Sequence, residues 1–180
     1  MAVPPDFTAG QILTAAQMNA IGLWLVKTQT IGTAVSSVTV TGAFSADYDD
    51  YLIRISGGSA STSLGLNLTL GSTTTGYYYG GMTGTYAGGA PASFAAGNAA
   101  SWAFAGSGES SGLIMRVELN QPFLTDETSF SNVYATMRTT GSGGITVGYL
   151  NDTTSYTAFT ITTSTGTITG GTIRVYGMRD

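Results

Sequence analysis

Three aspartates close together form the densest group of acidic side chains, and carboxylates are the side chains best suited to hold calcium. They are Asp47, Asp49 and Asp50. A calcium loop of the EF-hand type places oxygen ligands at alternate positions and closes with a glutamate. Here Tyr51 stands at the next alternate position, and no glutamate follows at the required distance. The sequence therefore favours a solvated turn over a calcium site, and no metal ligand is predicted.

Asp126 and Glu127 are a second candidate, since glycosidases place two carboxylates on either side of the bond that they cleave. No partner carboxylate at a set separation can be inferred from the sequence, so turn residues between strands are the favoured interpretation. The chain also has no histidine and no cysteine. This removes the commonest general base, the commonest transition-metal ligand and any thiolate metal site. We predict no catalytic residue, no cofactor and no enzyme activity.

The aromatic residues of the middle third are candidates for binding through contact alone. They are Tyr77, Tyr78, Tyr79, Tyr86 and Trp102. Aromatic faces at loop tips stack on sugars and anchor protein partners, because they bring a large rigid area at low entropic cost. The alternative is that these rings fill a core or a subunit interface. In a strand Tyr78 would face away from its two neighbours.

The composition points to one folded domain with a short appendage. Of the 180 residues 42% are hydrophobic and 9% are charged, and the net charge is −4. Nucleic-acid binding is not expected, because the basic residues are scattered along the sequence and no basic cluster is available for phosphates. No run of about 18 apolar residues occurs, so no membrane insertion is expected either. The basic residues are Lys27, Arg54, Arg116, Arg138, Arg174 and Arg179.

Alternating apolar and polar residues predict an all-β body over residues 31–180. In the clearest run Leu64, Leu66, Leu68 and Leu70 point one way, which is typical of a half-buried strand. Residues 80–112 are rich in glycine and alanine and have poor periodicity, so they are predicted to form a long loop with a strand inside. Short strands in this number predict a jelly-roll-like β-sandwich. Strands are predicted at 31–40, 51–56, 64–70, 77–79, 101–104, 113–119, 130–138, 145–149, 156–162 and 172–178.

The first thirty residues differ from the rest and are predicted to hold a short helix. Thr14 and Gln17 form a capping-box pattern, and Met18, Ile21 and Leu25 follow at helical spacing. A helix of about 12 residues there would expose more apolar surface than it can hide alone. Two accounts are open: the helix packs on its own β-domain, or it docks on another protein or on copies of itself.

Three short motifs carry a resemblance to a known class of proteins. Residues 7–19 read FTAGQILTAAQMN, residues 48–55 read YDDYLIRI and residues 171–177 read GTIRVYG. The first resembles a segment near the start of tail and other virion proteins of tailed bacteriophages. The other two resemble the opening and closing strands of sandwich domains in phage fibres and spikes. The chain is therefore similar to virion structural proteins of tailed phages.

The resemblance implies a tail fibre or spike on the exterior of the virion, made in the host cytoplasm and attached to other virion proteins by its N-terminal segment. It implies a homotrimer that contacts glycan on the host surface. A capsid decoration or head-fibre protein is an alternative, and a carbohydrate depolymerase is a rival of another class. The residues expected to anchor the chain are Phe7, Ile12, Leu13, Met18, Ile21, Trp24 and Leu25.

Overall fold

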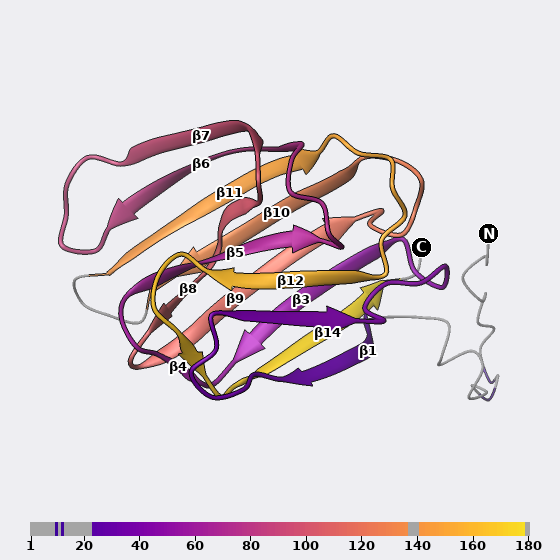
Figure 1. Ribbon diagram of the computed structural model, residues 1–180, viewed down its shortest axis with the longest axis horizontal. Helices are drawn as coiled ribbons and strands as arrows, with labels where there is room; N and C mark the ends of the chain where they lie inside the picture. Colours follow the sequence, from indigo (N-terminus) through magenta and orange to yellow (C-terminus); the bar gives the residue numbers. More distant parts are fainter. Residues whose placement is uncertain (1–9, 11, 13–22, 137–140, 179–180) are drawn as a thin grey trace.

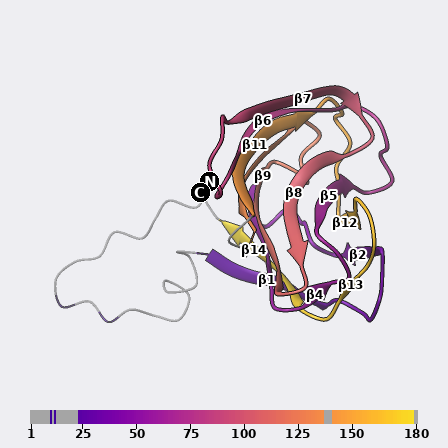
Figure 2. The same ribbon diagram turned by 90° about the vertical axis from the view of Figure 1, so that its left-hand side faces the viewer.

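The protein is all-β in a computed structural model that describes residues 10, 12, 23–136 and 141–178 (Figure 1). No helix occurs among these residues. Twelve strands form one continuous antiparallel sheet, which folds over into two facing layers (Figure 2). Two short strands, β4 (Ser59–Ala60) and β13 (Ile168–Thr169), pair separately. This arrangement is consistent with a β-sandwich.

The larger layer has the strand order β1-β14-β3-β9-β10-β11-β6-β7. Its strands are β1 (Leu23–Thr30), β14 (Thr172–Met178), β3 (Asp50–Ser56), β9 (Gly112–Asn120), β10 (Thr128–Ala135), β11 (Ser142–Leu150), β6 (Tyr77–Thr85) and β7 (Ala92–Ala99). The smaller layer has the order β2-β12-β5-β8. Its strands are β2 (Ser37–Thr41), β12 (Ala158–Thr163), β5 (Leu64–Leu70) and β8 (Trp102–Glu109).

The core lies between the layers and follows the predicted alternation. Leu64, Leu66, Leu68 and Leu70 of β5 are all buried, whereas the residues between them are half-buried. On β9 the odd-numbered residues from 113 to 119 are buried in the same way. Each such side chain contributes about 1.5–3 kcal/mol through removal of apolar surface from water. The strands predicted at 51–56, 64–70 and 172–178 are present as β3, β5 and β14.

The predicted N-terminal helix is wrong in its last part. Leu23–Thr30 forms strand β1, which pairs along its length with β14, and Val26 packs against the core. The helical spacing of Met18, Ile21 and Leu25 predicted a helix, but Leu25 lies in strand β1, where Val26 next to it points to the core. Residues 14–22 of the predicted helix lie outside the described residues.

Residues 80–112 form regular hairpins rather than the predicted long loop. Strand β6 continues to Thr85, and β7 and β8 follow it within this stretch. The many glycine and alanine residues hid the alternation, but small residues are needed for the close packing here. A Cβ on Gly81 would overlap the Phe94 ring of β7 and the carbonyl oxygen of Ile145 on β11. Glycine therefore lets β6 lie flat between its two neighbours.

Candidate functional site

Tyr77 and Trp102, two of the five predicted contact residues, belong to the core. Both are 0% exposed. The rings meet edge to face with their centroids 4.9 Å apart, and Trp102 stacks on Phe130. The Tyr77 hydroxyl accepts a hydrogen bond from the Leu70 amide and donates one to the Thr73 carbonyl. Burial raises the pKa of Tyr77 well above its usual range. A surface role for these two residues is therefore corrected to a packing role.

Tyr78, Tyr79 and Tyr86 lie nearer the surface. As the alternation predicts, Tyr78 faces away from Tyr77 and stacks on Tyr149 of β11, with ring centroids 5.1 Å apart. Tyr79 turns inward and packs against the core. Tyr86 is 50% exposed and directly follows the end of β6. The three rings therefore do not form one continuous binding surface.

A hollow lined by hydroxyl groups and aromatic rings opens where the two layers part. Strand β9 pairs with β8 over Gly112–Met115 and with β10 over Val117–Asn120. Beyond these paired segments β8 and β10 diverge, and a space is left between the layers. The hollow has a volume of about 310 Å3, at the lower end of the usual range for ligand pockets. It is lined by Ser63, Leu64, Gly65, Thr83, Phe104, Gly106, Ser107, Tyr134, Thr136, Ser142 and Ser164.

Two aromatic rings form one wall of the hollow. Phe104 of β8 and Tyr134 of β10 lie nearly parallel, with centroids 6.2 Å apart and an angle of 18° between their planes. Phe94 of β7 lies against Phe104 at 4.8 Å. The Phe104 side chain is exposed even though its apolar ring is well suited to burial. An exposed aromatic face of this kind is available to pack against a ligand.

The backbone of Phe104 adopts a left-handed conformation, with φ of 57°. For a residue with a Cβ this costs about 1–2 kcal/mol. The Phe104 carbonyl accepts a 2.7 Å hydrogen bond from the side-chain amide of Asn132. Asn132 is buried in β10. Strained residues that the surrounding structure holds in place gather at functional sites. Phe104 therefore has both a strained backbone and an exposed aromatic ring.

The hydroxyl groups of the hollow are held in defined positions. Ser107 donates to the Ala135 carbonyl at 3.1 Å, and the Thr136 hydroxyl accepts from the Ser142 amide at 2.7 Å. The Ser164 hydroxyl likewise accepts from the Gly65 amide at 2.9 Å. Each oxygen keeps further hydrogen-bonding capacity. Fixed hydroxyls beside an aromatic face match the chemistry of a sugar, which has polar edges and an apolar ring face.

The hollow lies at the opposite end of the strands from Leu23, the first residue of β1. Strand pairing places Leu23 level with Met178 and with Asp50, at the start of β3. The hollow is instead lined by Tyr134, near the end of β10, and by Ser142, at the start of β11. In Figure 1 β1 begins towards the right of the body, whereas β10 ends and β11 begins at its left. The end of the molecule with the hollow is therefore remote from the start of the described body.

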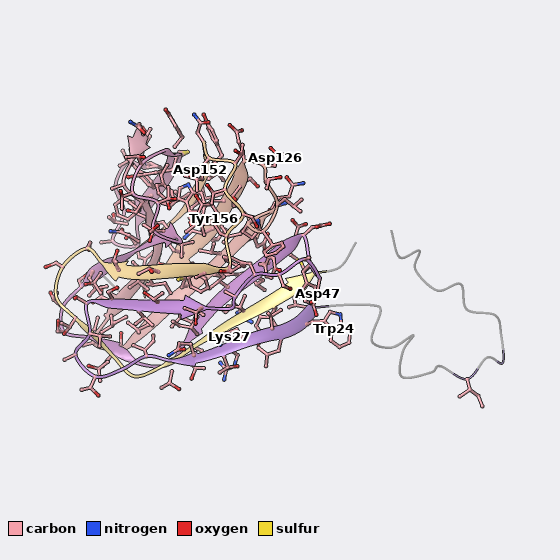
Figure 3. All side chains as sticks on the ribbon, turned by 45° about the vertical axis from the view of Figure 1, so that its right-hand side comes forward. Trp24, Lys27, Asp47, Asp126, Asp152 and Tyr156 are labelled. Carbon is pink, nitrogen blue, oxygen red and sulfur yellow. The ribbon has the colours of Figure 1, made fainter. Side chains whose placement is uncertain are left out.

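Asp47, Asp49 and Asp126 lie in turns and bends between strands, and Asp50 is the first residue of β3. Figure 3 labels Asp47, which precedes β3, and Asp126 and Asp152, which lie in the loops after β9 and β11. Asp47 contacts the Ser45 hydroxyl, and Asp126 accepts from the Glu127 amide at 2.8 Å. In the described part of the chain no three acidic side chains are placed to share a metal ion.

Asp152 accepts hydrogen bonds from three residues, Thr73, Thr154 and Tyr156. Hydrogen bonds from Thr154, followed by those from Tyr156 and Thr73, lower the pKa of Asp152 against a smaller opposing effect of burial. The Tyr156 hydroxyl donates to it at 2.8 Å and also meets the Thr73 hydroxyl at 2.7 Å. These contacts close the loop between β11 and β12, so the group has a structural role.

The structure places the predicted anchor residues in different environments. Leu25 is exposed on β1, Trp24 is half-buried in the same strand, and Ile12 is exposed. Phe7, Leu13, Met18 and Ile21 lie outside the described residues. No helix able to cross a membrane occurs among the residues that the structure describes.

Sequence reasoning missed Phe104 and Tyr134 as site residues. Phe104 was placed at the end of a short predicted strand, and Tyr134 was inside another strand, with no local signal to connect them. The left-handed φ and the pairing of β9 with both strands became visible only in the structure. Comparison with protein-family models, with curated proteins and with solved structures finds no match for this chain.

Proposed function

We propose that this chain is a non-enzymatic structural protein of a tailed-bacteriophage virion, with a jelly-roll-like body that contacts glycan on the host surface. The N-terminal motif at residues 7–19 and the strand motifs at 48–55 and 171–177 support the virion assignment through their resemblance to tail proteins. A tail fibre or spike on the particle exterior, joined to other virion proteins through its N-terminal segment, is the favoured form.

The observation that carries the glycan-contact proposal is the position of the hollow. A domain attached through residues preceding Leu23 presents its opposite end outward, and that end holds Phe104, Tyr134 and the fixed hydroxyls. The lining residues include no carboxylate. A hollow of this composition favours binding over glycoside cleavage, which uses a pair of carboxylates.

Exposed apolar residues on the outer face of the larger layer support assembly into a homotrimer. On the outer face of β6, beside β11, Met82 is 55% exposed. Val147 and Tyr149 continue the patch along β11. Contiguous exposed apolar patches of this kind mark interfaces between proteins.

The test of assembly is sedimentation of the full chain at several concentrations. Met82→Ser combined with Val147→Ser is expected to convert a trimer to a monomer. Leu25→Ser removes an exposed apolar side chain at the other edge of the same layer and is expected to leave the trimer intact. A monomeric wild-type chain would contradict the homotrimer.

The test of function is binding of the full chain to an array of immobilised neutral bacterial polysaccharides. Wild type is expected to bind a subset, and Phe104→Ala is expected to weaken that binding by about tenfold or more. Tyr176→Ala, which removes a half-buried ring of β14 outside the hollow and outside the apolar patch, is the matched control and is expected to bind normally. Equal binding by Phe104→Ala and wild type would reject the hollow as the contact site.

Imaging tests the virion assignment. When the chain is labelled, it is expected to be found at the tail of the particle. If it covers the whole capsid surface in hundreds of copies, it is a decoration protein instead.

A hydrolysis assay tests the absence of catalysis. Bound polysaccharide is expected to show no new reducing ends after incubation with the chain. Release of reducing ends would make the protein a depolymerase.

A further inference from the structure

Three arginines that are far apart in the sequence stand in one row across the larger layer. Arg54 of β3 is paired directly with Arg116 of β9 on one side and with Arg174 of β14 on the other. Directly paired residues of antiparallel strands project from the same face. This face is the outer one, since the neighbouring residues Ile53, Val117 and Val175 are buried in the core. The basic residues that look scattered in the sequence are therefore partly gathered.

This row is unfavourable for the folded chain by itself. Like charges directly opposite each other on neighbouring strands destabilise a sheet. The chain has six basic residues and a net charge of −4, so three arginines in one row do not follow from an excess of basic residues. An arrangement that opposes stability without a compositional cause points to a role outside folding.

Partners for the guanidinium groups occur at the two ends of the row. Arg116 Nη2 lies 3.3 Å from Glu118 Oε1, in a pair whose side chains are 61% and 46% exposed. Arg174 Nη1 donates to the Ser56 hydroxyl at 2.8 Å. An ion pair as exposed as Arg116 with Glu118 contributes little to stability. The guanidinium groups therefore retain donors that face solvent, since each has five N–H groups.

A shallow pocket adjoins the row on the side of Arg116. It has a volume of about 210 Å3 and is lined by Arg116, Glu118, Ser131, Asn132, Val133 and Ile145. Val133 and Ile145 are paired across β10 and β11 and form an apolar wall, and Ser131 offers a hydroxyl group. The pocket thus combines a cation that is paired with the Glu118 carboxylate, a hydroxyl and an apolar surface within one site.

We propose that the arginine row and this pocket bind an anionic polysaccharide through its carboxylate or phosphate groups. A sugar ring packs on Val133 and Ile145, and its acidic substituent receives hydrogen bonds from Arg116 and Arg54. Arginine suits both anions because its planar guanidinium can donate two parallel hydrogen bonds. Neighbouring strands are about 4.8 Å apart, so the row spans about 10 Å and serves successive charged groups of a polymer.

A polysaccharide suits this site better than a nucleic acid does. Duplex DNA carries one charge per about 1.7 Å of its length and needs many phosphate contacts. Three arginines on a chain of net charge −4 cannot supply them. A glycan with one acidic group per repeat matches three cations beside a pocket of sugar-ring size. The site is on the outer face of the larger layer, so it is separate from the Phe104 hollow and does not depend on it.

The experiment measures binding of the full chain to three immobilised polymers, and to duplex DNA for comparison, at two salt concentrations. Polygalacturonate supplies carboxylates, a glycerol-phosphate teichoic acid supplies phosphates, and dextran is the neutral control. We expect binding to at least one anionic polymer, no binding to dextran at this site, and weaker binding at high salt. The polymer that binds more tightly identifies the anion.

Arg54→Gln removes the central cation and is expected to weaken anionic binding by about tenfold or more. Lys27→Gln makes the same change of charge outside the row and is expected to leave binding unchanged. Arg54→Lys is expected to restore part of the affinity. Thermal melting is expected to show that Arg54→Gln is at least as stable as wild type, because a repulsion is removed.

The proposal would be overturned if Arg54→Gln and Lys27→Gln lost anionic binding equally, or if the wild-type chain bound neither anionic polymer. It would also be overturned if the chain bound duplex DNA more tightly than it binds polygalacturonate and teichoic acid. A changed oligomeric state in Arg54→Gln with unchanged anionic binding would also overturn it and assign the row to contact between copies. Phe104→Ala is expected to retain anionic binding, so failure of the hollow and failure of the arginine row give different results.

Discussion

The side-chain amide of Asn132 holds the backbone of Phe104 in place. Asn132 Nδ2 donates to the Phe104 carbonyl at 2.7 Å, and its Oδ1 accepts from the Thr146 amide at 3.1 Å. One buried side chain of β10 thereby connects β8 with β11, two strands that do not pair with each other. Because the left-handed φ of Phe104 is unfavourable by itself, we infer that Asn132 fixes the exposed ring at the hollow.

Asn132→Ala is expected to lower the free energy of unfolding by about 1–3 kcal/mol, because it removes the hydrogen bonds that Asn132 makes with the part-buried Phe104 carbonyl and the buried Thr146 amide. Urea denaturation measures this change. The matched control is Asn120→Ala, which removes the same group from an exposed position at the end of β9. Equal stability of the two variants would show that the Asn132 bonds are not needed. The Asn132 variant is also expected to bind neutral glycan more weakly, because the Phe104 ring is no longer held in place at the hollow.

Tyr77→Phe is expected to destabilise the fold by about 1–2 kcal/mol. The hydroxyl satisfies the Leu70 amide and the Thr73 carbonyl, and phenylalanine leaves both without that partner while keeping the ring against Trp102. Tyr149→Phe, at an exposed ring, is the control and is expected to change stability by less than about 0.5 kcal/mol. A midpoint of urea unfolding that is the same for both variants would contradict the role of the buried hydroxyl.

Local patterns predicted the strands whose two faces differ most. The leucines of β5 and the odd-numbered residues of β9 have apolar side chains inside and polar ones outside, and both strands were predicted within about a residue of their observed ends. Strand β1 was predicted as helix because Met18, Ile21 and Leu25 have helical spacing. Residues 23–30 form a strand because they pair with the edge of β14. That strand lies far away in the sequence, so no local pattern reveals the pairing.

The candidate sites depend on pairings that no local pattern contains. Phe104 and Tyr134 meet because β8 and β10 both pair with β9. Arg54, Arg116 and Arg174 form a row because the registers of three strands match at those positions. A shift of one residue in either register would turn one arginine toward the core. Sequence alone therefore predicted the class of fold and misjudged which aromatic and basic residues share a surface.

Gly177→Ala is expected to destabilise the protein by about 1–3 kcal/mol through overpacking. A Cβ at this position of β14 would overlap the ring of Tyr48. Gly84→Ala, where no atom lies within 4 Å of the added Cβ, is the matched control in β6. Thermal melting of both variants checks the prediction. If Gly84→Ala and Gly177→Ala melt alike, the ring of Tyr48 is not held against this strand.

Asp152→Asn is expected to reduce stability at neutral pH and to have little effect in strong acid. Hydrogen bonds from Thr154, Tyr156 and Thr73 lower the pKa of Asp152 below its ordinary value of 3.8. A carboxyl group whose pKa is lower in the folded state binds protons more readily when unfolded, so its contribution to stability is fully present above its ordinary pKa. That contribution is lost as the pH falls through the folded-state pKa. Urea unfolding of wild type and variant between pH 7 and pH values below the folded-state pKa measures the difference between their free energies. The difference is expected to narrow only in the acidic range, and a difference that stays constant throughout would show that the ionised carboxylate does not stabilise this loop.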